Sequence, residues 1–354
     1  MRSNRIPKQY SAAFLSALML FMGSPGQWAI APVMWIALIP LINSCLTREI
    51  SITSAARLGF ICGLLYNTAL LYWIVIALGR YGGLPLPVSV FAMLGLAAYM
   101  ALYFAFFTAT LSATKKLVPV LFSAPIIWVG LDQIKAWLFT GFPWQDLGYS
   151  QFQTPLLIQI ADITGHSGIT FLLVMTNALI ATILCKGPRK SLHPQHTFGQ
   201  IPTTVVACLL IVGTVIYGQH RLKTLEQVIE QAPTLTTAVM QGNIDQSEKW
   251  SADGQEKTVQ TYLELTELAS TDRSLALAIW PETALPFFPG ESTLLSSIQE
   301  FAAAANAPEI LTGAPHYSIP VSGTTNYFNS AFLITDNSLD SMQRYDKQQL
   351  VPFG

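Results

Sequence analysis

A carboxylate directly follows an apolar run in the last third of this chain. The run Leu275–Ile279 leads into Trp280-Pro281-Glu282-Thr283-Ala284. Such a run is typical of a buried strand, which places Glu282 where the strand ends. Desolvation there would raise the pKa of Glu282 toward the range that suits a general base. The alternative is that Glu282 caps a helical turn or lies in a solvated loop.

Lys347 is the second side chain that could do chemistry. It lies in Tyr345-Asp346-Lys347, shortly before the run Leu350–Gly354. An ammonium aimed at a developing oxyanion stabilises the transition state strongly where water is scarce. A lone lysine is more often one of several charges on a polar strand or turn, and its position alone does not decide between the two.

The two segments together resemble two members of the Glu-Lys-Cys triad of the nitrilase (carbon–nitrogen hydrolase) superfamily. Joined to a hydrophobic first part, they resemble the apolipoprotein N-acyltransferase family. The resemblance implies that Glu282 is the base and that Lys347 stabilises the oxyanion and holds the thiolate. It also implies that the third member, a cysteine on a later strand, takes the acyl group as a thioester.

No cysteine occurs in the part of the sequence that carries Glu282 and Lys347. All four lie in or beside apolar runs, where thiols behave as small hydrophobes: Cys45, Cys62, Cys185 and Cys208. By the resemblance, the sequence ends before the nucleophile, before a glutamate that follows Val-Pro-Phe-Gly, and before a last membrane helix. We therefore expect a carboxyl-terminally truncated fragment that is inactive by itself.

Two further segments favour this family over a generic nitrilase. Gly141 and Trp144 lie in a segment similar to the family's outward loop between spans five and six, and we expect them to contact substrate. An aromatic loop could equally anchor the chain at the membrane interface. Trp250 follows a segment similar to the first strand of the family's soluble domain. The resemblance places Trp250 near an acyl-chain pocket, whereas packing in the core is an equal interpretation.

Composition indicates a membrane protein. Of 354 residues, 51% are hydrophobic and only 11% are charged, against about 25% charged in soluble domains. The net charge of −1 hides an asymmetry, because residues 1–232 hold 14 Lys/Arg and 6 Asp/Glu whereas residues 233–354 hold 5 and 14. The acidic part gives no electrostatic reason to expect nucleic acid as a partner.

Charge-poor stretches predict about seven transmembrane helices within residues 1–220. Residues 9–47 contain no charged side chain and are long enough for a hairpin that breaks near Gly23-Ser24-Pro25-Gly26. The other five predicted spans are Ala56–Leu78, Pro87–Ser112, Val118–Leu138, Gln159–Cys185 and Thr203–Gln219.

Loop charges predict the orientation. Lys and Arg gather before span one and in alternate turns, including Lys115-Lys116 and Lys186–Lys190, while the other turns hold little beyond Arg80. The positive-inside rule then places the amino terminus in the cytoplasm and residues 233–354 outside, in the periplasm of a Gram-negative cell. The expected location is the bacterial inner membrane.

Residues 233–354 alternate between strand and helix patterns, which favours a layered α/β fold. The resemblance implies the front part of a nitrilase-like α-β-β-α sandwich, since the fold of that superfamily needs roughly twice the about 120 residues present. The predicted strands are 235–241, 275–280, 309–314 and 327–335, and the predicted helices are 253–270 and 292–305.

Few ionisable residues lie inside the predicted spans. Asp132 and Lys135 are three residues apart and should share a helix face, where they can neutralise one another. Asp162 is ambiguous between structure and function. His193 and His196 lie in a turn rich in Pro and Lys, and we expect no metal and no cofactor.

The resemblance implies a lipoprotein N-acyltransferase with ping-pong covalent catalysis. Its donor would be a phospholipid, and its acceptor the amino group of the diacylglyceryl-cysteine of an apolipoprotein. A membrane-tethered amidase of the nitrilase superfamily would share the Glu-Lys pair, and a non-catalytic truncated remnant would share every feature of the sequence. These two alternatives stay open.

Overall fold

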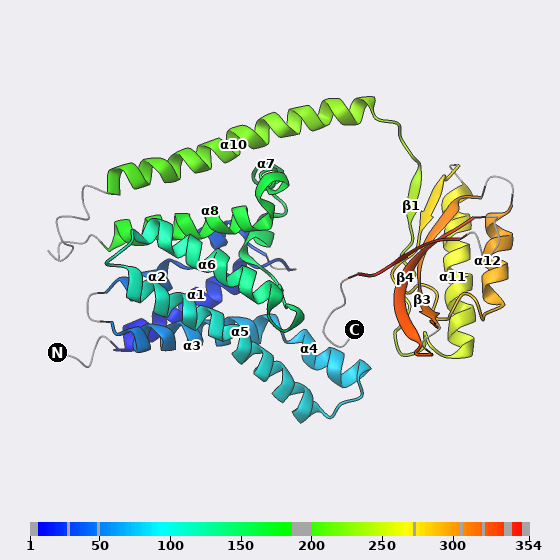
Figure 1. Cartoon of the computed structure of the whole chain (residues 1–354), viewed down its shortest axis with the longest axis horizontal. Helices are drawn as coiled ribbons and strands as arrows, with labels where there is room; N and C mark the ends of the chain where they lie inside the picture. The colour runs from blue at the N-terminus through cyan, green and yellow to red at the C-terminus, as the bar shows by residue number, and fades with distance from the viewer. Residues whose placement is uncertain are drawn as a thin grey trace. The chain divides into compact units, whose positions relative to one another are not determined.

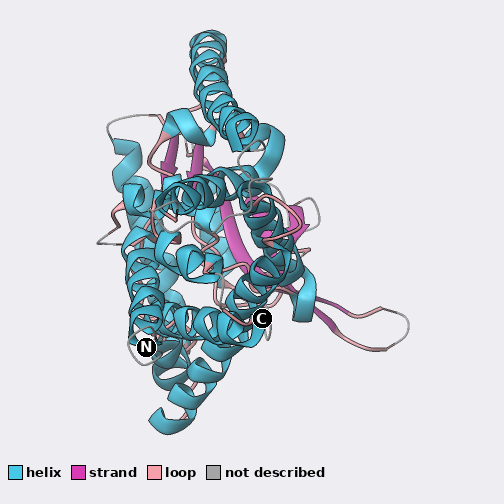
Figure 2. Ribbon diagram, turned by 90° about the vertical axis from the view of Figure 1, so that its left-hand side faces the viewer, coloured by secondary structure: helices cyan, strands magenta, loops and turns pink. Residues whose placement is uncertain are grey.

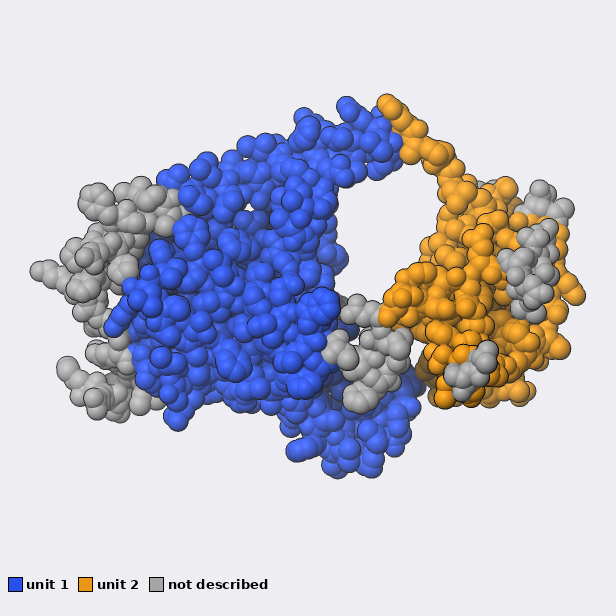
Figure 3. Space-filling model, viewed as in Figure 1, with its two compact units in different colours: residues 1–230 blue, residues 231–354 orange. Residues whose placement is uncertain are grey.

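The structure is a computed structural model of the chain (Figure 1). It describes residues 6–26, 29–47, 50–185, 200–271, 274–304, 307–320, 323–335 and 342–348. The chain divides into two compact units, Met1–Glu230 and Gln231–Gly354 (Figure 3). The division falls between residues 220 and 233, where the sequence changes from basic and apolar to acidic.

Unit 1 is helical. Figure 2 shows several of its helices nearly end-on. The α-helices are α1 (Ile6–Gly23), α2 (Ile39–Leu46), α3 (Ile52–Leu70), α4 (Trp73–Ile76), α5 (Leu86–Thr114), α6 (Val120–Trp137), α7 (Pro155–Ile158), α8 (Ala161–Leu184) and α10 (Gln200–Gln231). Shorter turns are η1 (Ala31–Trp35), η2 (Ala77–Tyr81), η3 (Leu138–Thr140) and η4 (Leu147–Gln151).

Several of these helices fit a membrane half, as the composition predicts. Among the described residues, α5, α8 and Thr204–Gln231 of α10 are long and apolar enough to cross a bilayer. A fourth span results if α3 and Trp73–Tyr81, which are bent by 48° at their junction, are taken together. A helix occupies each predicted position, while the count of seven spans stays a prediction.

Two predicted spans are not straight helices. The span predicted at 56–78 breaks after Leu70 and continues as α4 and the π-helical η2. Within α8, Gly165 adopts a φ of 62°, which kinks the helix near its beginning. A charge-poor stretch indicates that a segment is long enough to cross the membrane. It does not indicate such breaks, because they depend on individual backbone angles.

In the described part of unit 1, the most extensive helix packing is between α3 and α5. Gly59 and Gly63 of α3 form a G-x-x-x-G pattern, which lets two backbones approach closely. A Cβ on Gly59 would lie 2.2 Å from Thr108 Oγ1 and 2.3 Å from the Phe104 carbonyl oxygen. A Cβ on Gly63 would lie 2.8 Å from the Phe104 ring. This helix pair therefore depends on the absence of two side chains.

Unit 2 contains a five-stranded sheet in the order β1-β2-β3-β4-β5. The first three strands are parallel, and the β3–β4 and β4–β5 pairs are antiparallel. The strands are β1 (Thr237–Val239), β2 (Leu277–Ile279), β3 (Glu309–Ser318), β4 (Asn326–Ile334) and β5 (Gln343–Asp346). The helices α11 (Ala252–Thr271) and α12 (Leu294–Ala302) precede β2 and β3.

Both helices of unit 2 pack on one apolar core. Val259 and Tyr262 of α11, and Leu295 and Ile298 of α12, belong to the same buried cluster as Ile310 of β3. The Trp280 indole lies in this core and donates a hydrogen bond to Thr266 Oγ1 at 3.0 Å. Each strand and helix predicted for this part of the sequence is present. The mixed sheet agrees with a layered α/β fold, while the nitrilase-like sandwich stays a prediction.

We predict that Gly59→Ala destabilises unit 1, because the new methyl group would force the backbones of α3 and α5 apart. Overpacking of this kind costs about 1–3 kcal/mol. Gly95→Ala in α5 is the control, since a Cβ there meets nothing within 4 Å. Thermal unfolding in detergent should show a lower midpoint for Gly59→Ala only. Equal midpoints for the two variants would contradict the packing argument.

Candidate active site

The structure brings Glu282 and Lys347 together although 65 residues separate them. Lys347 Nζ donates a hydrogen bond to Glu282 Oε1 at 3.2 Å. Glu282 follows β2, and Lys347 follows β5, which lies at the opposite edge from β1. The two residues that the sequence singles out thus form one ion pair.

Strand β3 holds the turn that carries Glu282. The Trp280 amide donates to the Leu311 carbonyl at 2.8 Å, the Leu285 amide to the Gly313 carbonyl at 3.0 Å, and the Gly313 amide to the Pro281 carbonyl at 3.3 Å. A Cβ on Gly313 would lie 2.4 Å from the Thr283 amide nitrogen and 2.8 Å from Glu282 Cα. Glycine at 313 therefore lets the Glu282 turn lie directly against the strand.

Strand pairing positions Lys347. Ser330 of β4 is paired with Asp346 of β5, and its hydroxyl donates to Asp346 Oδ1 at 2.7 Å. One residue further on, the Lys347 amide donates to the Asn329 carbonyl at 2.9 Å. The β4–β5 register thus fixes where the lysine side chain leaves the sheet.

Asn329 is a member of this site that the sequence analysis missed. Its Nδ2 donates to Glu282 Oε1 at 2.5 Å, while its carbonyl holds the Lys347 amide. Asn329 therefore contacts both candidate residues. One feature of the sequence could have identified Asn329: it lies inside a predicted strand, where asparagine is uncommon.

The pKa of Glu282 is lowered, whereas the sequence analysis expected it to be raised. Hydrogen bonds from Lys347 and Asn329 lower the pKa of Glu282, and they outweigh desolvation, which raises it; the charges of Lys347 and Lys249 add smaller lowering effects. The prediction of a raised pKa is wrong for this structure, because the Glu282 side chain is 65% exposed. Half-buried Lys249 has a lowered pKa because burial disfavours its charge, although Glu282 attracts it.

Trp250 does not pack in the core, so that interpretation is wrong. It is 50% exposed and lines a hollow in unit 2 together with Pro286, Phe287, Phe288 and Pro315. The wall of this hollow is mixed, because Gln255, Glu291, Ser292 and Thr293 also line it, and its apolar side suits a hydrocarbon chain. The role of Trp250 in binding an acyl chain stays a prediction.

Gly141 and Trp144 belong to unit 1, in the loop between η3 and η4. Gly141 has a φ of 85°, and a Cβ there would lie 2.1 Å from the Ala136 carbonyl oxygen. Trp144 packs against the Trp73 ring, with centroids 4.9 Å apart, and stacks on Phe142. Glycine thus folds the loop back on α6, and a substrate contact by either residue stays a prediction.

The predicted pair in α6 is present. Lys135 Nζ donates to Asp132 Oδ1 at 3.0 Å and also to Asp146 Oδ1. Asp162 accepts hydrogen bonds from the Tyr217 hydroxyl and pairs with Arg221, which is a structural link between α8 and α10. No group of three or more His, Cys, Asp or Glu among the described residues could hold a metal ion. His193 and His196 lie outside those residues.

Comparison with known proteins points to one family. Residues 15–179 match the family described as apolipoprotein N-acyltransferase N-terminal domain. The chain is 37% identical to an apolipoprotein N-acyltransferase of Geobacter metallireducens over 99% of this chain and 65% of the relative. Relatives of the same name from Vibrio vulnificus and Vibrio cholerae are 31% and 30% identical, over 99% of this chain and 65% and 66% of their lengths. The chain thus spans about two thirds of the curated relatives that it matches.

We predict that Lys347→Met raises the pKa of Glu282, because it removes the largest cause of the lowering. Asn329→Ala should raise it less, and Lys249→Met, the control, least. Since the folded-state pKa is lowered, the stabilisation from this pair is present above the ordinary glutamate pKa and is lost as the pH falls through the folded-state value. Carboxylate labelling of Glu282 across pH, read by peptide mass spectrometry, measures the shift, and an unchanged profile in Lys347→Met would refute the assignment.

Proposed function

Because the chain belongs to the apolipoprotein N-acyltransferase family, we propose that the whole protein transfers an acyl chain from a membrane phospholipid to the α-amino group of the diacylglyceryl-cysteine of an apolipoprotein. The names of the relatives support this activity. The described apolar helices support a protein that works in the membrane, where both substrates reside.

The observation that carries the proposal is the contact between Glu282 and Lys347. Glu282 is the general base, and its lowered pKa keeps it ionised at neutral pH, ready to accept a proton. Covering by substrate would remove water from this exposed carboxylate and raise its pKa toward that of a thiol. Lys347 supplies the positive charge for the oxyanion, and Asn329 holds both groups in place.

The reaction proceeds in two half-reactions. Glu282 takes the proton of a cysteine thiol, the thiolate attacks the ester carbonyl of the phospholipid, and the lysophospholipid leaves as an alcohol with that proton. The acceptor amine then attacks the thioester and loses a proton to Glu282, and the thiol leaves. All four cysteines of residues 1–354 lie in unit 1. We assign the nucleophile to the third of the relatives' length that has no counterpart in residues 1–354.

A membrane-tethered amidase remains the second candidate function. The Glu-Lys pair is common to both reactions, so it does not separate them. The match of residues 15–179 to the N-terminal domain of the acyltransferase family favours acyl transfer, because that stretch lies wholly in unit 1.

We predict that a chimera carries out acyl transfer. Residues 1–354 would replace the matching part of the Geobacter metallireducens relative, whose remaining third supplies the rest of the protein. In this chimera, Glu282→Gln and Lys347→Ala should each lower transfer by about 10²–10⁴-fold, because they remove the base and the oxyanion charge. Transfer from labelled phospholipid to a lipopeptide, and trapping of the acyl-enzyme, provide the measurements.

Glu264→Gln is the matched control, since Glu264 is exposed on α11, accepts a hydrogen bond from Gln260 and does not line the hollow that contains Trp250. It should leave transfer within about twofold, as is usual for surface changes. Near-normal thioester formation in Glu282→Gln or Lys347→Ala would remove the corresponding assignment. An active chimera that hydrolyses amides but transfers no acyl chain would favour the amidase.

We also predict the orientation, in which residues 233–354 face the periplasm of a bacterial inner membrane. The basic turn 186–190 lies outside the described residues, so the argument rests on loop charge. Alkaline phosphatase fused after Gly354 should be active, because the enzyme folds only outside the cytoplasm, whereas a fusion after Arg189 should be inactive. The reverse pattern would overturn the orientation.

A further inference from the structure

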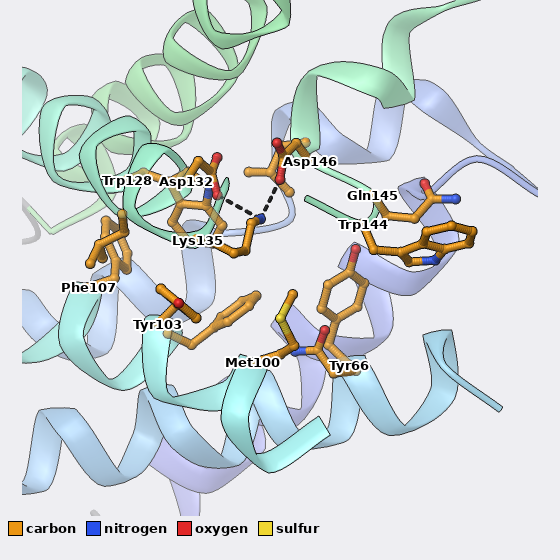
Figure 4. A pocket seen from close by; sticks show the side chains of 14 residues that line it. Tyr66, Met100, Tyr103, Phe107, Trp128, Asp132, Lys135, Trp144, Gln145 and Asp146 are labelled. Atoms are coloured by element: carbon orange, nitrogen blue, oxygen red, sulfur yellow. Dashed lines mark hydrogen bonds and ion pairs between the residues drawn. The ribbon is translucent and has the colours of Figure 1, made fainter. Parts of the chain in front are cut away.

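The Lys347 side chain makes few contacts of its own. In unit 1, by contrast, Lys135 is bonded to the carboxylates of both Asp132 and Asp146, and Figure 4 shows the three in the pocket that they line. In the described part of the chain, Lys347 has one side-chain partner, the carboxylate of Glu282, and its own side chain is 36% exposed. The place of its ammonium therefore depends on β5, the strand that ends just before it.

Strand β5 is short and lies at an edge of the sheet. It contains four residues and pairs with β4 alone among the described strands. An edge strand has backbone hydrogen bonds on one side only. Side-chain contacts must therefore help to hold the register that brings Lys347 to Glu282.

A row of side chains on the other face of the sheet supplies such contacts. Arg344 and Asp346 of β5 are two residues apart, so they share the face opposite to that of Lys347. Arg344 Nε lies 3.0 Å from Asp346 Oδ1, which also accepts from Ser330. Arg344 Nη1 donates to Nε2 of His316 in β3. This last contact crosses β4 and ties β5 to β3.

The contact joins the two strands that position the candidate catalytic pair. Gly313 of β3 lies three residues before His316 and leaves room for the turn that carries Glu282. Lys347 directly follows β5. The bond from Arg344 to His316 therefore fixes the base and the ammonium relative to one another, from the face of the sheet on which neither lies.

The His316 ring must be neutral to make this contact. Phe328 and Phe332 of β4 pack against the ring, with ring centroids 6.2 and 6.1 Å away. Because a guanidinium can only donate, Nε2 of His316 is the accepting nitrogen and the ring proton is on Nδ1. A protonated ring would present two donors and a positive charge to Arg344, and the bond would be lost.

The surroundings of His316 favour its neutral form. Burial and the charge of Arg344 lower the pKa of His316, and the charge of Asp346 opposes them. Among the described residues, these two are the charged groups that face the ring, and neighbouring Tyr317, whose hydroxyl is bonded to Glu291, is a further titratable group. Since the folded-state pKa is lowered, the contact is present above the ordinary histidine pKa and is lost as the pH falls through the folded-state value.

We propose that His316 and Arg344 are positioning residues that hold Lys347 against Glu282 through β5, and that protonation of His316 releases this hold. His316 is the one histidine of residues 231–354, and that range contains no cysteine. A change in unit 2 between about pH 5 and 8 therefore reports His316. The consequence for catalysis rests on the proposed function, whereas the contact itself does not.

The test measures the contact between Glu282 and Lys347 without turnover, in the 354-residue chain in detergent. Carboxylate labelling of Glu282 is read between about pH 5 and 8 and divided by that of Glu264, which is exposed on α11 and corrects for the pH dependence of the reagent. The pKa of Glu282 is lowered, so its own ionisation does not change in this window. We expect the ratio to rise about two- to fivefold as the pH falls, the range for loss of an exposed ion pair.

Three variants test the residues. His316→Gln keeps an acceptor for Arg344 that does not titrate, so the ratio should not change with pH. Arg344→Met removes the donor, so the ratio should be raised at every pH. His220→Gln is the control, since it changes an exposed histidine of α10, and it should keep the rise.

A ratio that stays constant in the unchanged chain, or a rise that persists in His316→Gln, would overturn the proposal. If Arg344→Met unfolds unit 2, His316→Gln still decides. A role of His316 in stability alone would lower the unfolding midpoint of the variant but would leave the pH dependence of the ratio in place.

Transfer by the chimera with the Geobacter metallireducens relative separates this inference from the proposed function. Its kcat should fall toward acid pH with little change in KM, because Lys347 acts on the transition state, and His316→Gln should reduce that fall. If the labelling ratio changes as expected but the chimera transfers no acyl chain, the proposed function fails and the positioning role stands. If the chimera is active and the ratio does not change with pH, the positioning role alone fails.

Discussion

The register of the antiparallel strands β3, β4 and β5 is the constraint on which the candidate site depends. The β4–β5 pairing sets Ser330 opposite Asp346, so that the next residues in space, Asn329 and Lys347, meet through a backbone hydrogen bond. A shift by one residue would turn the Lys347 side chain to the other face of the sheet and away from Glu282. The Glu282–Lys347 ion pair therefore depends on the pairing of strands that are far apart in the sequence.

The second requirement of the site is close backbone approach. Gly313 in β3 leaves room for the turn after β2, and three backbone hydrogen bonds hold that turn against the strand. The resulting carboxylate is oriented but exposed, which explains why its pKa is lowered by its partners rather than raised by burial. A base of this kind is ionised before substrate arrives, and its strength depends on how much water the bound substrate excludes.

Unit 1 must hold polar groups among apolar helices. Gly59 and Gly63 let α3 and α5 approach closely because neither residue has a side chain. The loop after α6 instead depends on charge, because Asp146 is bonded to Lys135 on one side and to His166 of α8 on the other. That arrangement ties the aromatic loop of Trp144 to two helices.

The sequence by itself determined the division into a basic apolar part and an acidic α/β part, and the positions of the main strands and helices of unit 2. These features follow from local composition and periodicity. Glu282 and Lys347 were also identifiable, because the motifs around them resemble the family. Only the tertiary structure decided that Asn329 joins them, that Glu282 is exposed, that Trp250 lies outside the core and that Asp146 completes the Lys135 pair. Each of these depends on contacts between segments 11 to 65 residues apart or on exposure in the folded chain, and neither is encoded in a local pattern.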